Sequence, residues 1–270
     1  MSDSVDETPP YSTILAEQIE EGLRELNRST TGLALSGVSA GLDIGFGPLL
    51  MAATYTTVAG VAGDALTRFL LALAYTIGFV FVVLGRSELF TEHTTLAVLP
   101  VLDGRASMRE LGRLWGVVYA TNVAGGVVFA LFAVFALPST TGIDRSAFVE
   151  IARPIAAHSP GGLLVGAILA GWLMGLLSWL VTAARETTSR LAFVLLVTGA
   201  IGFLHLPHSI AGNVEVLLAT LVSPAFSWGR YAAFLAIATV GNAVGGTVFV
   251  ALLKYAHVVR GGETVDIGAD

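Results

Sequence analysis

Two short polar clusters interrupt a mostly apolar sequence and contain the side chains best suited to do chemistry. The first holds Glu88, Thr91 and His93, and the second holds His208 and Glu215. An ionisable group that stays charged inside a membrane costs at least ~2.5–3.5 kcal/mol, so it is rare there without a partner or a function. A neutral imidazole both donates and accepts hydrogen bonds, and its ordinary pKa near ~6.5 lets it exchange protons at physiological pH. The residue types therefore indicate proton exchange with a small polar solute.

His208 is the most informative of these residues because it directly follows Pro207. The proline ring removes one backbone donor and frees carbonyl groups upstream, which breaks a helix. A bare anion pays a large desolvation cost in a narrow apolar passage, and a proton donor there lets it pass as the neutral acid. The sequence predicts that His208 is such a donor in a pore.

Metal binding is the weaker interpretation of the same clusters. His205 lies one turn before His208 and could join it in binding a metal with His93 or Glu92, but ligands spread over two segments are a poor metal motif. The chain has no cysteine, which excludes a thiolate metal site, a cysteine nucleophile and a disulfide framework. We expect no metal, no cofactor and no enzymatic activity.

The composition indicates that a lipid bilayer surrounds the elements that position these residues. Hydrophobic residues make up 54% of the 270 positions and charged residues only 13%, against roughly 25% charged in a soluble domain. About 20 apolar residues cross ~30 Å of hydrocarbon as a helix. The sequence predicts six such segments, at 31–60, 68–101, 111–137, 160–184, 190–222 and 229–257.

The second and fifth segments are too long for one plain helix, and the polar clusters lie in their middle. Backbone that is not helical is tolerated at membrane depth only where protein or a water-filled cavity satisfies its polar groups. Two interrupted spans at corresponding places in the two halves are the best sequence indication of a transport site. We therefore expect helices two and five to be broken.

A repeated motif relates the two halves. Asn122, followed by Gly125 and Gly126, recurs as Asn242, followed by Gly245 and Gly246. Three spans per half is an odd number, so the halves must insert with opposite orientation. The predicted fold class is an all-α integral membrane protein with six transmembrane helices in an inverted 3+3 repeat.

Charge asymmetry predicts the orientation in the membrane. With the N-terminus inside, most of the 14 Lys and Arg residues fall on the cytoplasmic side. We expect a multi-pass protein of the cell membrane with both termini cytoplasmic. It would have an N-terminal tail at 1–30 with an amphipathic helix at 11–28, a transmembrane domain at 31–257 and a C-terminal tail at 258–270. No long basic cluster points to nucleic acid.

The motifs together resemble the formate/nitrite transporter family, which are channels for small monovalent anions and their conjugate acids. The resemblance is carried by Glu88-Leu89-Phe90-Thr91, by His208-Ser209-Ile210-Ala211 and by Gly241-Asn242 with Gly245-Gly246, in the expected order across 31–257. It implies an aquaporin-like fold that assembles in the lipid bilayer as a homopentamer, with one pore in each protomer.

The resemblance also implies roles for individual residues. His208 would be the central pore histidine, Thr91 its hydrogen-bonding partner and Asn242 the residue that orients them, with Asn122 in the equivalent place of the other half. Glu88 is expected to cap the second half-helix of span two. Six further residues match the family's apolar constrictions and the loop that moves with them: Tyr75, Phe79, Leu89, Phe90, Ile201 and Ala211.

The chain departs from formate-type members at three positions. Pro207 replaces an acidic residue before the pore histidine, and Gly171 stands where a second asparagine is expected. No lysine lies near the outer start of helix four, where only Arg153 and His158 are close. That lysine supplies a positive field that draws anions inward, so the transported anion stays open, as does whether Arg86, Arg153 or His158 replaces it.

Three alternative functions remain open at this point. The first is a neutral-solute pore of the aquaporin type, although the paired Asn-Pro-Ala triplets of water channels are absent. The second is a membrane enzyme or metal-binding protein that uses the histidines. The third is a non-conducting interaction protein whose pore is closed by bulky Tyr75 and Phe79.

Overall fold

The computed structural model describes residues 9–136 and 138–261, and every secondary-structure element in those residues is helical. Residues 1–8 of the predicted N-terminal tail and residues 262–270 of the predicted C-terminal tail lie outside the described residues. The first seven helices are α1 (Tyr11–Asn27), α2 (Thr30–Asp43), α3 (Phe46–Val58), α4 (Asp64–Gly85), α5 (Phe90–Leu96), α6 (Leu99–Leu102) and α7 (Met108–Phe135). The others are α8 (Pro138–Thr141), α9 (Arg145–Ala156), α10 (Pro160–Ala183), α11 (Thr187–Phe203), α12 (Ser209–Val222), α13 (Trp228–Gly246), the π-helical η1 (Thr247–Leu252) and α14 (Leu253–Arg260).

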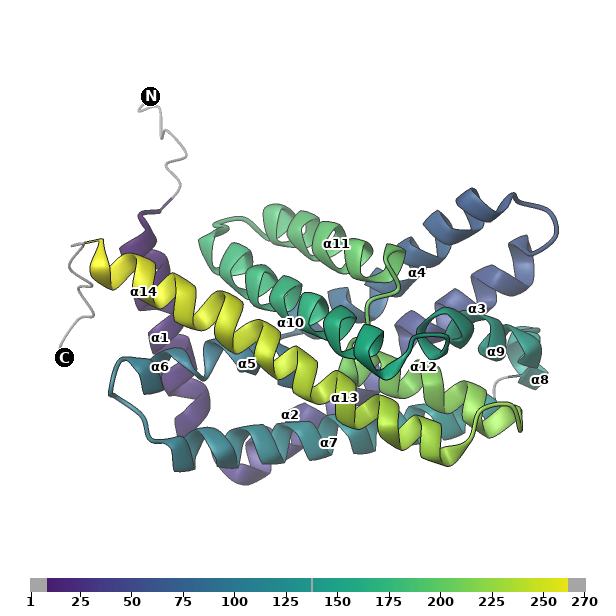
Figure 1. The fold of residues 1–270 in the computed structure, drawn as a ribbon, viewed down its shortest axis with the longest axis horizontal. Helices are drawn as coiled ribbons and strands as arrows, with labels where there is room; N and C mark the ends of the chain where they lie inside the picture. The colour runs from purple at the N-terminus through teal and green to yellow at the C-terminus, as the bar shows by residue number, and fades with distance from the viewer. Residues whose placement is uncertain (1–8, 137, 262–270) are drawn as a thin grey trace.

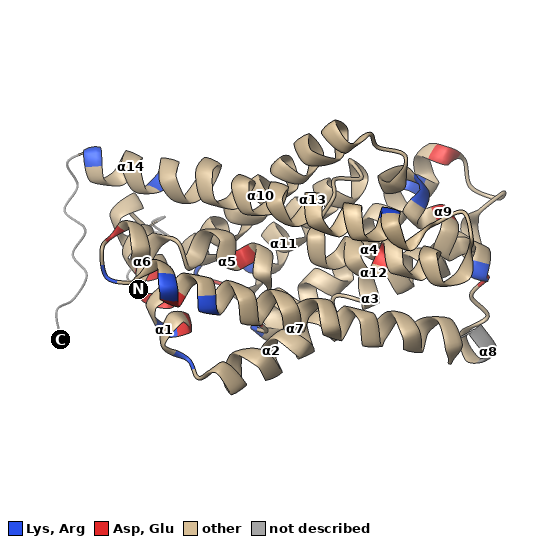
Figure 2. Ribbon diagram, turned by 60° about the horizontal axis from the view of Figure 1, so that its bottom comes forward, with Lys and Arg blue, Asp and Glu red and all other residues tan. Residues whose placement is uncertain are grey.

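The long helices lie side by side in an elongated bundle, and the first and last helices, α1 and α14, lie at the same end of it (Figure 1). Most charged residues gather toward the two ends of this bundle, while its middle is largely uncharged (Figure 2). Five stretches are long and apolar enough to cross a membrane, and α11 and α12 are shorter apolar helices. The prediction of an all-α membrane protein is therefore confirmed.

The helix of the first predicted span, 31–60, is interrupted briefly between α2 and α3. α2 ends at Asp43 and α3 begins at Phe46, with Gly45 between them. A Cβ atom on Gly45 would lie 2.3 Å from the ring of Phe129 on α7, so only glycine lets the chain turn this close to the neighbouring helix.

Two further interruptions lie where the polar clusters occur in the sequence. α4 ends at Gly85 and α5 begins at Phe90, and α11 ends at Phe203 while α12 begins at Ser209. Just after each first helix a non-glycine residue takes a left-handed conformation, Arg86 with φ 57° and His205 with φ 51°. Strained backbone of this kind often marks functional sites, since the surrounding packing must hold it in place.

Glycine positions bring the long helices into backbone contact. A Cβ atom on Gly41 of α2 would lie 2.2 Å from the Asn122 carbonyl oxygen of α7, and one on Gly171 of α10 would lie 2.2 Å from the Asn242 carbonyl oxygen of α13. Small residues let membrane helices approach closely, which is how such helices pack without a hydrophobic driving force. At this contact Gly171 leaves no room for a larger side chain, such as the asparagine expected from the resemblance.

α1 lies across one end of the bundle (Figure 1). Its apolar stripe is buried, with Leu15 and Ile19 fully inaccessible. Gln18 donates hydrogen bonds to the Ser178 and Thr182 hydroxyls of α10 at 3.0 Å each. A Cβ atom on Gly22 would meet the Leu96 carbonyl oxygen at 2.4 Å, so this glycine, which weakens an isolated helix, is needed for docking.

Candidate functional site

The starts of the two short helices α5 and α12 meet in the interior through Thr91 and His208. The Thr91 Oγ1 atom and the His208 Nε2 atom are 2.8 Å apart, and both side chains are fully buried. His208 is the N-cap of α12, and its Nδ1 atom accepts hydrogen bonds from the backbone N–H groups of Ile210 at 3.3 Å and Ala211 at 3.1 Å. The chain thus brings together the two residues that the sequence paired.

These contacts determine which ring nitrogen of His208 carries the proton. An atom that accepts two N–H groups cannot itself bear hydrogen, so the Nδ1 atom is unprotonated and the imidazole is neutral. The Nε2 atom then carries the hydrogen and donates it to the Thr91 hydroxyl. This hydroxyl retains its own hydrogen, which it can donate to a polar solute.

Asn242 holds the backbone on both sides of His208. Its Oδ1 atom accepts from the Ser209 N–H group at 2.7 Å, and its Nδ2 atom donates to the Pro207 carbonyl at 3.0 Å and to the Ala167 carbonyl at 2.8 Å. Asn242 therefore supplies the hydrogen bonds that an interrupted helix loses at its broken ends.

Asn122 makes the matching set of bonds at the other interruption. Its Oδ1 atom accepts from the Phe90 N–H group at 2.8 Å, and its Nδ2 atom donates to the Glu88 carbonyl at 2.8 Å and the Gly37 carbonyl at 2.9 Å. The two asparagines thus hold the two breaks in the same way, each from the long helix beside it.

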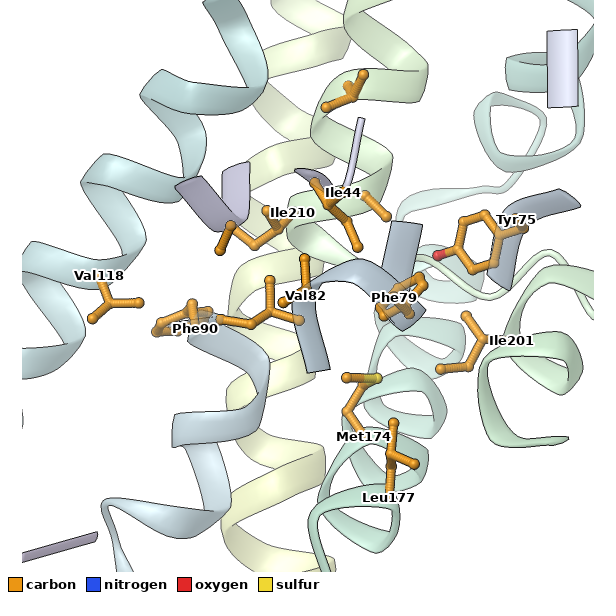
Figure 3. Packing of buried hydrophobic residues seen from close by; sticks show 14 of the residues in the cluster. Ile44, Tyr75, Phe79, Val82, Phe90, Val118, Met174, Leu177, Ile201 and Ile210 are labelled. Atoms are coloured by element: carbon orange, nitrogen blue, oxygen red, sulfur yellow. The ribbon is translucent and has the colours of Figure 1, made fainter. Parts of the chain in front are cut away.

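An aromatic column on α4 covers one side of the imidazole. The Phe79 ring packs edge-to-face on the His208 ring with centroids 5.0 Å apart, and Tyr75 follows at 5.1 Å from Phe79. Ile201 of α11 lies beside this pair (Figure 3). Phe79 and Ile201 are inaccessible to water and Tyr75 is buried, so no water-sized passage touches Phe79 or Ile201.

The other expected constriction residues lie on either side of the central pair. Leu89 and Ala211 are fully buried next to the starts of α5 and α12. Phe90 instead packs edge-to-face against Trp115 at 5.8 Å and Tyr119 at 5.1 Å, both on α7. Figure 3 places Phe90 toward Val118 and away from Tyr75. Phe90 thus anchors the start of α5 to a long helix.

The expectation that Glu88 caps the start of α5 is wrong. Leu89 is the N-cap and makes no side-chain cap, and the first N–H group of α5, that of Phe90, is bound by Asn122 of α7 instead. The Glu88 carboxylate forms ion pairs with Arg28 and with the Nε2 atom of His93, and Arg28 also binds Glu25 at 2.9 Å. The Glu88 carboxylate therefore belongs to a charged network that connects the break between α4 and α5 with the segment between α1 and α2. No sequence pattern predicted this pairing, because Arg28 and Glu88 are 60 positions apart in the chain.

A pocket of about 500 Å³ opens beside this network at the end of the bundle that carries α1. α1 supplies acidic residues to its wall, including Glu17 and Glu21, while Arg86 and Arg190 contribute positive charge. His93 also lines this pocket, which therefore reaches the first residues of α5 from that end of the bundle.

The residues considered as replacements for the missing lysine lie in different places. Arg153 is bound by Glu150 at 2.6 Å, and this contact holds the pKa of the Glu150 carboxyl below its usual range. The positive charge of Arg153 is therefore largely compensated by Glu150. His158 lines a second pocket of about 210 Å³ together with Arg230, and Arg86 lines the first.

The histidines do not assemble into a metal site in the part of the chain that the structure describes. No group of three or more His, Cys, Asp or Glu side chains converges among residues 9–136 and 138–261. His208 is bound to Thr91, while His93 is bound to Glu88. The two imidazoles thus serve separate contacts.

Comparison with known proteins agrees with this architecture. A family model described as formate/nitrite transporter matches residues 12–256. The inner membrane protein YfdC of Escherichia coli (strain K12) is 32% identical over 258 residues, which cover 94% of this chain and 81% of that protein. A solved FNT family ion channel superposes with a TM-score of 0.79 at 22% identity, over 90% of this chain and 98% of that one. A solved pentameric formate channel with formate bound superposes with a TM-score of 0.69 at 24% identity, over 85% of this chain and 98% of that one.

Proposed function

Since this chain belongs to the formate/nitrite transporter family, we propose that it is a membrane channel for small monovalent anions or their neutral conjugate acids. The observation that carries the proposal is the buried contact between Thr91 and His208, where the starts of two half-helices meet. Such interrupted helices bind transported solutes at the midplane in many transporters, because their free backbone groups and helix dipoles point at the site.

In this proposal His208 is the proton donor at the centre of the path. A neutral imidazole leaves the site uncharged at rest, so an arriving anion meets hydrogen-bond donors rather than a fixed ion. The Thr91 hydroxyl and the His208 Nε2–H group would donate hydrogen bonds to its oxygen atoms. For the transfer, the imidazole would first take up a proton from water and become an imidazolium. Its Nε2–H bond would then break as an O–H bond forms on the anion, which leaves as the neutral acid while His208 returns to the neutral imidazole. Passing as a neutral species avoids the desolvation cost of an ion in an apolar constriction.

The proposed channel has six transmembrane segments in an inverted 3+3 repeat of aquaporin type. α4 with α5 would form the second segment and α11 with α12 the fifth, each broken in the middle. The equivalent bonds of Asn122 and Asn242 support this arrangement, since both hold the residues that flank a break. So do the left-handed residues Arg86 and His205, which follow the first helix of each pair.

We also propose that the protein forms a homopentamer in the cell membrane with both termini in the cytoplasm. One solved structural neighbour is a pentameric formate channel. Large exposed apolar residues on the bundle surface, such as Leu35, Phe132 and Leu196, suit contact with lipid or with neighbouring protomers. The division into an N-terminal tail at 1–30, a channel at 31–257 and a C-terminal tail at 258–270 belongs to the same proposal, although α14 continues as a helix to Arg260.

Uptake into proteoliposomes tests the proposal. Purified wild type and His208→Ala protein are compared for uptake of formate, nitrite, acetate, lactate and hydrosulfide at several external pH values. We expect uptake of at least one of these solutes above that of protein-free vesicles, and its loss in the variant. Unchanged uptake in His208→Ala would remove the role of the histidine, and no uptake of any solute by the wild type would contradict the channel function.

A further inference from the structure

The second pocket, of about 210 Å³, combines apolar walls with two basic side chains. It is enclosed by α9, α12, α13 and the start of α10. Figure 1 shows α9 at the end of the bundle opposite to α1. None of the described residues that line this pocket takes part in the hydrogen bonds of Thr91 and His208. The pocket is therefore separate from the site on which the proposed function rests.

One face of α13 forms a wall of this pocket. Four of its residues have the spacing of three and four positions that aligns side chains along a helix: Arg230, Ala233, Phe234 and Ile237. Phe234 is buried and its ring lies against α12, where a Cβ atom on Gly212 would be 2.4 Å from it. This close packing fixes the ring, so it cannot turn to fill the pocket.

Apolar side chains from three other helices complete the lining. They are Ile155 of α9, Leu163 of α10 and Val216 of α12. Together with Phe234 they belong to one buried apolar cluster. Such walls offer water few hydrogen-bond partners and suit a hydrocarbon chain instead.

Arg230 and His158 supply the polar part of the pocket. The Arg230 guanidinium donates to the Ala156 carbonyl at the end of α9. That bond uses one of its five N–H donors, so others are available to an anion. His158 lies in the exposed segment between α9 and α10. No acidic side chain is among the described residues that line the pocket, so no carboxylate competes there with an incoming anion.

The start of α13 has the features of a helix end at a membrane surface. Trp228 is 61% exposed and packs edge-to-face with Tyr231, with ring centroids 6.1 Å apart. Trp and Tyr are enriched where a membrane meets water, so this end of α13 lies at the level of the lipid headgroups. An anion with an apolar tail at that level is a phospholipid.

We propose that this pocket binds an anionic phospholipid of the phosphatidylglycerol type. Its phosphate binds Arg230 and His158, and the start of one acyl chain lies against Phe234 and Ile237. Basic pockets between transmembrane helices bind anionic headgroups in this way. The bound lipid links α9 to α13 and stabilises the folded protein by mass action. The inference goes beyond the proposed transport and does not depend on which solute is transported.

Thermal unfolding of the full-length protein in detergent micelles tests the inference. Phosphatidylglycerol is titrated in parallel with phosphatidylcholine, which has the same acyl chains but no net charge, and with glycerol phosphate, which has no acyl chains. We expect phosphatidylglycerol to raise the unfolding temperature up to a plateau. The other two compounds should have little effect, because the pocket needs both the negative charge and the apolar tail.

Two matched pairs of variants locate the binding site. Arg230→Gln is compared with Arg145→Gln, because Arg145 also donates to a backbone carbonyl, that of Val134, but does not line the pocket. Ala233→Leu, which narrows the pocket, is compared with Ala232→Leu at an exposed position outside it. We expect Arg230→Gln to raise the amount of phosphatidylglycerol needed for half of the stabilisation about fivefold, which is the contribution of one basic residue near an anionic surface. Ala233→Leu should raise it too, and both controls should match the wild type.

Several outcomes would overturn the inference. They are equal stabilisation by phosphatidylglycerol and phosphatidylcholine, equal effects of the two arginine variants, and equal effects of the two alanine variants. Glycerol phosphate as effective as the lipid would mean that the pocket binds a free anion only, which also contradicts it. If Arg230→Gln does not fold, His158→Ala takes its place, since His158 lies in an exposed segment. An unchanged titration of that variant would then contradict the proposed headgroup contact.

Discussion

The Thr91 hydroxyl and the His208 imidazole lie 117 positions apart in the chain and share a buried hydrogen bond of 2.8 Å. Each residue lies at the start of a short helix, so this one bond joins the two interruptions of the fold. Because His208 Nδ1 is already engaged by backbone N–H groups, the Nε2 side is the one that remains for chemistry.

Thr91→Val should reduce transport while leaving the shape of the site intact. Valine fills the same volume but leaves the His208 Nε2–H group without a partner, which costs about 1–3 kcal/mol in a buried position. We expect lower uptake and a lower unfolding temperature. Thr91→Ser is the control, because serine keeps the hydroxyl; if valine and serine variants transport equally, the hydroxyl has no role in transport.

Asn122→Ala and Asn242→Ala should destabilise the protein to a similar degree. Each substitution removes three buried hydrogen bonds, two to residues that flank a break and one to a neighbouring long helix. At about 1 kcal/mol for each bond, we expect a loss of about 3 kcal/mol, measured by thermal unfolding in detergent. Asn27→Ala, at the exposed end of α1, provides the control. A large effect at one asparagine alone would contradict the equivalence of the two breaks.

Gly171→Ala should separate α10 from α13. The added Cβ atom would lie 2.2 Å from the Asn242 carbonyl oxygen, which belongs to a helix backbone and cannot move aside alone. Overpacking of this kind costs about 1–3 kcal/mol, and it should also lower uptake by shifting Asn242. The matched control is Gly161→Ala on the same helix, where the new Cβ atom meets nothing within 4 Å. That variant should be as stable as the wild type or more stable, because alanine favours helix.

Glu25→Gln should stabilise the protein at neutral pH and lose this advantage in acid. Burial is the main reason that the pKa of Glu25 is raised above 4.5, and the nearby Glu88 charge adds to it. A raised pKa means that the folded protein binds the proton more tightly than the unfolded chain does. The resulting stability is fully present below about pH 4.5 and is lost as the pH rises through the pKa of the folded state.

Glutamine mimics the protonated acid, so the unfolding temperature of Glu25→Gln should exceed that of the wild type at pH 8. The two should converge as the pH falls toward about 4.5. Glu20→Gln, on the exposed face of α1, should show no such trend. A variant that is less stable at every pH would mean that the ion pair of Glu25 with Arg28 outweighs the cost of its burial.

The sequence by itself determined the membrane fold class and the candidates for the site. Long apolar segments are visible in composition, because a bilayer leaves charged residues few places to lie. The two polar clusters and the repeated Asn-Gly-Gly motif are local features, so His208, Thr91, Asn122 and Asn242 could be selected before any coordinates were known. The close packing of Gly45 against the Phe129 ring was not predicted, because that ring belongs to another helix.

Only the tertiary structure decided what each polar group touches. The pairing of Glu88 with Arg28 and His93 replaced the expected helix cap, and Phe90 proved to pack against α7. The burial of Glu215, whose Oε1 atom has no hydrogen-bond partner among the described residues, likewise became visible only in the folded chain. The physical reason is common to all three: hydrogen bonds and charge pairs depend on distances of a few ångströms between helices, and chain order does not specify those distances.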